Sequence, residues 1–236
     1  MQTILVINSK GGSGKTTLAT NIACYFASID KKTAIMDYDP QGSSLHWLKI
    51  RSAKAKAIHG ADAATQKGNL IRSLQMYIPE DTEILVIDAP AGVDGVLLQE
   101  MVKKTDYILV PVAPSIIDIH ASADFIRDLL LKGGIRKHKT QVAVVANRVR
   151  KSMPVYKPLE RFLQILRLPF LTRISDSDQY ILASELGTGI FEMDAAQVTT
   201  ERKEFEPILN WLDPQADRQT ARPENVVPLE RLRNGA

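Results

Sequence analysis

The sequence is poor in cysteine, in long apolar runs and in unbalanced charge. Cys24 is the single cysteine among 236 residues, so neither a disulfide framework nor a cysteine-rich metal site can be built. No apolar run approaches the roughly 20 residues of a membrane span. Polar residues at 8–10 interrupt the apolar start, which argues against a secretory signal, and we expect a cytoplasmic protein. The chain is long enough for one large α/β domain with a proper core.

The charge is small overall but unevenly placed. The formal net charge is +3, yet the segment 127–173 holds twelve Lys or Arg residues against two acids. Such a local excess is typical of a surface that binds nucleic acid. It is equally compatible with solvated helix faces, and the charge pattern alone leaves both interpretations open.

Apolar strand-like segments alternate with helix-like segments along the chain. The expected strands cover 4–7, 33–37, 83–88, 107–112, 141–146 and 170–174. The expected helices cover 18–27, 69–78, 93–104, 116–132, 156–166, 177–186 and 195–212. This alternation predicts a single α/β domain over 1–212, a doubly wound and mostly parallel sheet flanked by helices. The segment 45–68 has no clear assignment, and 213–236, rich in proline and charge, is expected to be a flexible tail.

One glycine-rich loop stands out at the start of the chain. Its sequence over 10–17 is KGGSGKTT, between an apolar strand and a helix-forming segment. A polyphosphate needs several backbone N–H groups turned inward, and glycine lets a tight loop wrap that closely. The helix that follows directs its positive end at the same anion. In such a loop Lys15 reaches the terminal phosphates and the Thr16 hydroxyl can ligate Mg²⁺.

Polar side chains also follow other expected strands. These are Asp37, Asp39, Asp88 and Asn147. Ligands of doubly wound sheets bind at the carboxyl ends of the strands, so we expect these groups near the loop. Asp88 is placed to support a Mg²⁺ ion, usually through water because Mg²⁺ dehydrates reluctantly. Of Asp37 and Asp39, one could hold the water shell of the metal and the other could orient an attacking water.

Three segments together resemble the ParA/MinD family of ATPases. The loop 10–17 resembles the deviant Walker A motif of that family. The segment 37–42, DYDPQG, resembles its switch I in the partition-protein version, and 87–92, IDAPAG, resembles its switch II. The likeness covers 1–212, with the motifs in the right order. It implies a P-loop fold and a Mg²⁺-dependent ATPase that dimerises when ATP is bound.

The resemblance also implies roles for individual residues. Lys10 would reach the nucleotide of the partner in a homodimer, Lys15 would contact the β and γ phosphates, and Asp39 would orient the water. Thr16 would bind Mg²⁺, with Asp37 and Asp88 supporting the metal through water. Asn147 would contact adenine and Thr17 the α phosphate. The nucleotide site implied is thus Gly11, Gly12, Ser13, Gly14, Lys15, Thr16, Thr17 and Asn147.

The resemblance favours the DNA-partition branch of the family. That branch implies ATP-bound dimers on nonspecific DNA, a nucleoid location, and a cargo-borne, ParB-like activator of hydrolysis. Within the basic segment we expect the DNA contacts at Arg148, Arg150, Lys151, Lys157 and Arg161. The charge-balanced, proline-interrupted tail makes membrane binding unexpected. A membrane-associated regulator of division or secretion, or a metabolic enzyme on the same fold, remains the alternative.

Overall fold

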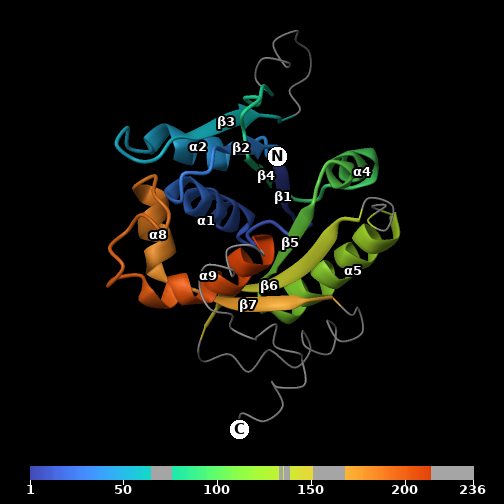
Figure 1. The fold of residues 1–236 in the computed structure, drawn as a ribbon. Coiled ribbons are helices and arrows are strands. Elements are labelled where there is room, and N and C mark those ends of the chain that lie inside the picture. Colours follow the sequence, from blue (N-terminus) through green and yellow to red (C-terminus); the bar gives the residue numbers. More distant parts are fainter. Residues whose placement is uncertain (65–75, 133–134, 136–138, 151–167, 214–236) are drawn as a thin grey trace.

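The described residues form one sheet of seven parallel strands at the centre of the molecule (Figure 1). The structure, a computed structural model, describes residues 1–64, 76–132, 135, 139–150 and 168–213. The strands are β1 (Gln2–Val6), β2 (Thr33–Asp37), β3 (Ile58–Asp62), β4 (Ile84–Asp88), β5 (Tyr107–Val112), β6 (Gln141–Val149) and β7 (Phe170–Ser175). They lie in the order β3-β2-β4-β1-β5-β6-β7. The predicted doubly wound sheet is confirmed.

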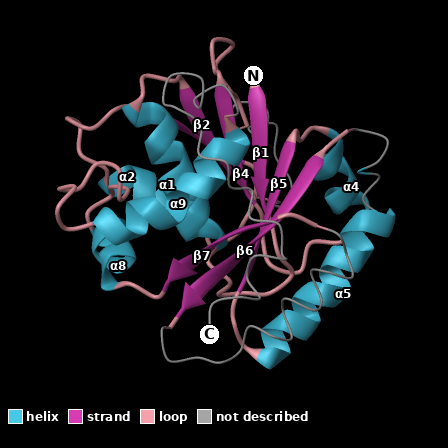
Figure 2. Cartoon of the chain, turned by 60° about the horizontal axis from the view of Figure 1, so that its bottom comes forward, coloured by secondary structure: helices cyan, strands magenta, loops and turns pink. Residues whose placement is uncertain are grey.

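Helices cover both faces of the sheet. Figure 2 shows α1 (Lys15–Ser28), α2 (Ser43–Ile50), α8 (Asp178–Glu185) and α9 (Thr199–Leu212) on one side of the strands. On the other side lie α4 (Gly95–Lys103) and α5 (Ile116–Lys132). The expected helices in these regions are therefore present, with ends shifted by at most four residues.

Each face of the sheet has its own apolar core, because successive side chains of a strand point to opposite faces. Along β1 and the residue after it, Ile4 and Val6 pack in the core that contains α1, whereas Leu5 and Ile7 pack in the core that contains α5. All four side chains are fully buried. Burial on both faces explains why the strands read as continuous apolar runs instead of alternating ones.

Strand register brings several of the expected site residues to one level. Val6 at the end of β1 and Asp37 at the end of β2 both pair with Asp88 at the end of β4. The loop after β1 therefore begins beside two carboxylates that are far from it in sequence. This is the edge of the sheet at which α/β proteins bind their ligands.

The segment 45–68, which the sequence left unassigned, contains most of α2 and the edge strand β3. The β3 sequence IHGAD has little of the β-branched and aromatic content that favours strands. It pairs with β2 along its whole length. At Gly60 an added Cβ would come within 2.7 Å of Leu48 on α2, so the strand needs a glycine where the helix crosses it. Tertiary packing stabilises this strand, and its local sequence pattern does not predict it.

The expected strand at 107–112 is present as β5, although it contains Pro111, which has no N–H to donate to a neighbouring strand. β5 continues through Pro111, which pairs with Val145 on β6. On the other side β1 has already ended, because its last paired residue faces Leu109. The Leu109 carbonyl accepts from the N–H of Ile7, directly after β1, and alternate residues of a parallel strand face the same neighbour. The missing N–H of Pro111 therefore faces no strand, and its carbonyl accepts from the Asn8 side chain at 2.7 Å.

Three expectations fall wholly or largely outside the described residues. They are the helix at 156–166, most of the helix at 69–78, and the tail at 213–236. The last described helix, α9, ends at Leu212. The division into a domain of 1–212 and a flexible tail therefore stays a prediction.

Candidate functional site

The loop between β1 and α1 is held in a tight curve by glycine and by internal hydrogen bonds. Gly12 and Gly14 have φ of 74° and 89°, a left-handed conformation that costs other residues energy. The Ser13 hydroxyl donates to the Lys10 carbonyl at 3.1 Å. Asn147 at the end of β6 donates its amide to the Ser13 carbonyl at 2.8 Å. A Cβ on Gly14 would lie 1.8 Å from that amide, so the loop and β6 meet as closely as backbone permits.

Lys15 opens α1 and lies inside the curve of the loop. Its side-chain ammonium donates to the Lys10 carbonyl at 3.2 Å, and the residue is 7% exposed. Burial lowers the pKa of Lys15, while the nearby carboxylates of Asp88 and Asp39 act in the opposite direction. A buried cation at the mouth of a glycine loop provides a fixed charge for a phosphate.

Thr16 and Asp88 meet beside Lys15. The Thr16 hydroxyl donates to Asp88 Oδ2 at 2.8 Å. Asp88 Oδ1 is buried and, within the described part of the chain, has no hydrogen-bond partner. Burial, together with the charges of Asp37 and Asp39, raises the pKa of Asp88 to about 7, although the Thr16 hydroxyl and Lys15 oppose the shift. This carboxylate lacks a full set of donors, as expected of a group that supports a cation.

Asp37 lies next to Asp88 but is fully engaged with the protein. One oxygen accepts from the Ser44 hydroxyl at 2.6 Å and from the Ser44 backbone N–H at 3.0 Å; the other accepts from the Asp39 N–H at 2.9 Å. Asp37 therefore fastens the start of α2 to the end of β2.

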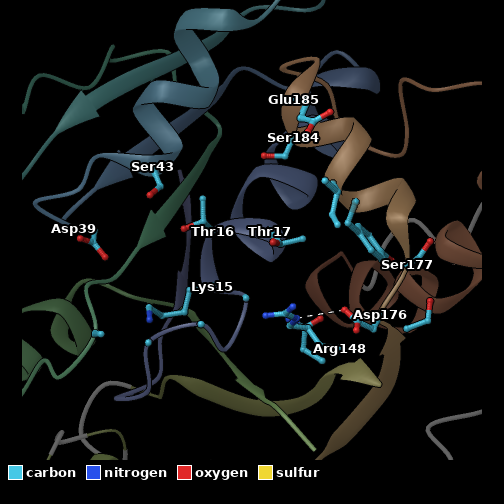
Figure 3. Close-up of a pocket in the computed structure, with 18 residues that line it drawn as sticks. Lys15, Thr16, Thr17, Asp39, Ser43, Arg148, Asp176, Ser177, Ser184 and Glu185 are labelled. Atoms are coloured by element: carbon cyan, nitrogen blue, oxygen red, sulfur yellow. Dashed lines mark hydrogen bonds and ion pairs between the residues drawn. The ribbon is translucent and has the colours of Figure 1, made fainter. Parts of the chain in front are cut away.

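The Asp39 backbone N–H belongs to this network, whereas its side chain accepts from the Gln41 N–H at 3.0 Å and faces the open space in front of the loop. It lines a cavity of about 490 Å³ together with Lys15, Thr16 and Thr17. In Figure 3, Asp39 lies on one side of Lys15, and Arg148 with Asp176 lies on the other. The expected residues Gly11, Gly12, Gly14 and Asn147 also line this cavity.

Part of the cavity wall carries no motif that the sequence analysis recognised. Ser175 ends β7, Asp176 and Ser177 follow it, and α8 adds Tyr180, Ile181, Ser184 and Glu185. In Figure 3 the side chains of Ser184 and Glu185 stand across the cavity from Lys15. Only their position after a strand, at the same edge of the sheet, could have suggested them.

Lys10 points away from this cavity. Its carbonyl accepts from Lys15, whereas its own ammonium lies 3.6 Å from Asp118 Oδ1 on α5. The side chain is 42% exposed. The side chains of Lys15 and Lys10, both from this loop, thus point to opposite sides of it.

Of the expected DNA-contacting residues, Arg148 lines this cavity, and Arg150 shares with it the partner Asp176. Arg148 and Arg150, at the end of β6, both pair with Asp176, at 3.4 and 2.9 Å. Their side chains are more than half exposed. Arg148 has a φ of 59°, the strained left-handed conformation, at the point where the strand leaves the cavity. Lys151, Lys157 and Arg161 lie outside the described residues.

No group of three or more His, Cys, Asp or Glu residues in the described part of the chain is arranged to hold a metal. A cation at Thr16 and Asp88 would therefore take most of its ligands from water and from a bound anion, which is the habit of Mg²⁺. The loop amides, Lys15 and the Thr16–Asp88 pair together suit a polyphosphate carrying such an ion.

Comparison with known proteins settles the family. The family model described as CobQ/CobB/MinD/ParA nucleotide binding domain matches residues 4–190. The chain belongs to this family. With its motifs and relatives, it is a ParA-like P-loop ATPase. Maintenance of carboxysome distribution protein A of Halothiobacillus neapolitanus is 27% identical over 213 residues, which cover 90% of this chain and 96% of that protein.

Solved structures of the family share the fold. An apo McdA of Cyanothece superposes with a TM-score of 0.69 at 17% identity, covering 90% of this chain and all of the other. An ATP complex of a Cyanothece McdA variant has a TM-score of 0.67 at 14% identity, covering 88% and 96% of the two chains. The MinD cell division protein of Aquifex aeolicus has a TM-score of 0.65 at 17% identity, covering 95% and 100%. Among the described helices, none is both long and apolar enough to span a membrane.

Proposed function

We propose that this protein is a Mg²⁺-dependent ATPase that dimerises on ATP and positions or partitions a cargo on nonspecific DNA. One observation carries the proposal: a single phosphate loop directs Lys15 into its own cavity and Lys10 out of it. A loop that serves one nucleotide needs one such lysine. The second, outward lysine suits a nucleotide held by another copy of the chain.

The roles of the site residues follow from this arrangement. Lys15 contacts the β and γ phosphates, the backbone of 11–17 cradles them, and Thr16 ligates Mg²⁺. A bound Mg²⁺ would supply neutralisation of phosphate charge, and the unpaired oxygen of Asp88 would be available to accept from its water ligands. Asp39 orients the attacking water from the open side of the cavity. Phosphoryl transfer needs chiefly positioning and charge neutralisation, so one such carboxylate suffices.

Asn147 and Asp37 support the site in less direct ways. Asn147 holds Ser13 by its amide nitrogen and lines the cavity, where it contacts the adenine end of ATP. Asp37 keeps the switch segment 37–44 anchored at both ends, because its oxygens accept from Asp39 and from Ser44. Movement of Asp39 on ATP binding is thereby confined to a short loop.

The cargo role draws on the relatives. The curated relative of 27% identity is named for carboxysome distribution, and the motifs resemble those of partition proteins. We propose a cytoplasmic, nucleoid-associated ATPase whose hydrolysis is stimulated by a ParB-like partner on the cargo. A basic surface of Arg148, Arg150, Lys151, Lys157 and Arg161 supplies the phosphate contacts to DNA.

Retention on immobilised random-sequence duplex tests the DNA surface. We expect retention with Mg²⁺ and ATP, its absence in Lys15→Ala, and a steep fall with salt, because each Lys or Arg contact releases counterions. Arg150→Ala should lower the logarithmic salt slope by about 1. Lys54→Ala, a surface lysine outside the basic segment, is the matched control. Retention that is the same in high salt would refute the electrostatic surface.

A further inference from the structure

Lys10, the lysine of the phosphate loop that points out of the cavity, pairs with an acidic residue of its own chain. Lys10 Nζ lies 3.6 Å from Asp118 Oδ1, on the first turn of α5. The Lys10 and Asp118 side chains are 42% and 26% exposed. The pair is open to water and to other charges, so it is reversible by its nature.

The carboxylate that receives Lys10 is itself held in place. Ser115 donates its hydroxyl to Asp118 Oδ2 at 2.6 Å, and the Asp118 N–H donates back to the Ser115 hydroxyl at 3.1 Å. This reciprocal pair caps the start of α5 and fixes the Asp118 side chain. An acid in the first turn is also favoured by the helix dipole. Oδ1 is left facing Lys10.

The same helix holds the loop at a second point. One turn after Asp118, the Ser122 hydroxyl accepts from the Asn8 amide at 2.9 Å. Asn8 Oδ1 in turn accepts from the Lys10 backbone N–H at 3.3 Å. Residues four apart on a helix share a face, so α5 presents Asp118 and Ser122 to the same short stretch of loop. Ser122 thus fixes the backbone of Lys10 through Asn8, and Asp118 holds the Lys10 side chain.

We propose that Asp118 is a positioning residue that holds Lys10 against α5 in the single chain and releases it to the triphosphate of a second copy. This inference rests on the proposed function, in which Lys10 acts across the dimer. An exposed ion pair contributes little, so the several charges of a bound triphosphate displace Asp118. Until then the pair competes with dimerisation. Asp118 thereby raises the ATP and protein concentrations that assembly requires.

The test measures the dissociation constant of the Mg²⁺·ATP dimer by sedimentation, in an Asp39→Ala background that prevents turnover. Asp118→Asn keeps the acceptor for Ser115 but removes the charge facing Lys10. We expect its dimer dissociation constant to fall by about two- to tenfold, since one such pair breaks in each subunit of a symmetric dimer. Asp118→Glu should stay close to the parent. Asp124→Asn on the same helix, which removes the partner of Arg127, should change nothing.

Lys10→Ala separates this inference from the function on which it rests. Asp118→Asn should fail to rescue the dimer in Lys10→Ala, whereas a general effect on α5 would act without Lys10. An Asp118→Asn constant equal to or above the parent, with Lys10→Ala monomeric, would overturn the role of Asp118 and leave the proposed function intact. A parent that stays monomeric with ATP, or a Lys10→Ala protein that dimerises as well as the parent, would overturn both.

Discussion

At the scale of single residues, the candidate site contains ionisable groups that are buried away from the water that would stabilise their charges. Lys15 is buried, and its pKa is lowered by that burial. Asp88 is buried as well, and its pKa rises to about 7. Both groups are therefore held in an environment that disfavours their charged forms. A polyphosphate beside Lys15 and a cation beside Asp88 would relieve both penalties at once.

The raised pKa of Asp88 predicts a pH-dependent gain from Asp88→Asn in the ligand-free protein. A carboxyl whose folded pKa lies near 7 and unfolded pKa near 4 destabilises the fold when ionised. That penalty, about 2–4 kcal/mol, is complete above pH 7 and disappears as the pH falls from 7 toward 4. Thermal unfolding should therefore show Asp88→Asn with the higher Tm at pH 8 and a vanishing difference near pH 4.

The amide of the variant retains an acceptor for the Thr16 hydroxyl. Asp62, which ends the edge strand β3 and is only half-buried, gives a matched control in Asp62→Asn. A lower Tm for Asp88→Asn at pH 8 would mean that the carboxylate is stabilised by contacts other than those seen here.

At the scale of elements, a buried ion pair ties the far wall of the cavity to the rest of the fold. Arg51, just after α2, makes a two-pronged contact with Glu192, in the segment that joins α8 to α9. The two side chains are 6% and 14% exposed. Cys24 of α1 donates its thiol to the same carboxylate at 3.2 Å, and burial raises the pKa of that thiol. Cys24 on α1 and Arg51 after α2 thus both contact Glu192, and α8, which lines the cavity, directly precedes the segment that contains Glu192.

Glu192→Ala should accordingly be costly. It leaves the Arg51 guanidinium buried without its carboxylate, a change that destabilises proteins by about 3–5 kcal/mol. Urea unfolding should show this loss, whereas Asp81→Ala, which breaks the exposed pair with Lys32, should leave stability within error. The double variant Arg51→Met, Glu192→Leu should recover much of the loss, because no charge remains buried. A Glu192→Ala protein as stable as the parent would contradict this account of the α8 anchor.

At the same scale, the central elements were predictable and the peripheral ones were not. β1, β4 and β5 are buried on both faces, so their continuous apolar runs predict these strands without information from the rest of the chain. β3 depends on the contact of Gly60 with Leu48, and α8 lines the cavity without a recognised motif. The pairing of Lys10 with Asp118 joins residues more than a hundred positions apart. Contacts of this kind follow from the topology, which local patterns do not contain.

At the scale of the whole molecule, the candidate site residues lie at one edge of the sheet, and the phosphate loop directs its two lysines to different places. Lys15, Thr16 and Asp39 line a single cavity, and Asp88 is buried behind it and accepts from Thr16, whereas the Lys10 side chain pairs with Asp118 on α5. We propose that such a chain binds a nucleotide alone and completes its site only with a second copy. Dimerisation on ATP is therefore the central claim, and DNA retention and cargo positioning depend on it.

The most direct measurement is light scattering coupled to size-exclusion chromatography on Asp39→Ala, with Mg²⁺ and ATP and with or without a random-sequence duplex. Asp39 lines the open side of the cavity and contacts neither Thr16 nor Lys15 by a hydrogen bond among the interactions described, so its loss should stop hydrolysis but spare ATP binding. We predict a dimer that forms only with ATP and that binds the duplex only as a dimer. A monomer under all of these conditions would contradict the account, because Lys10 would then have no second nucleotide to reach.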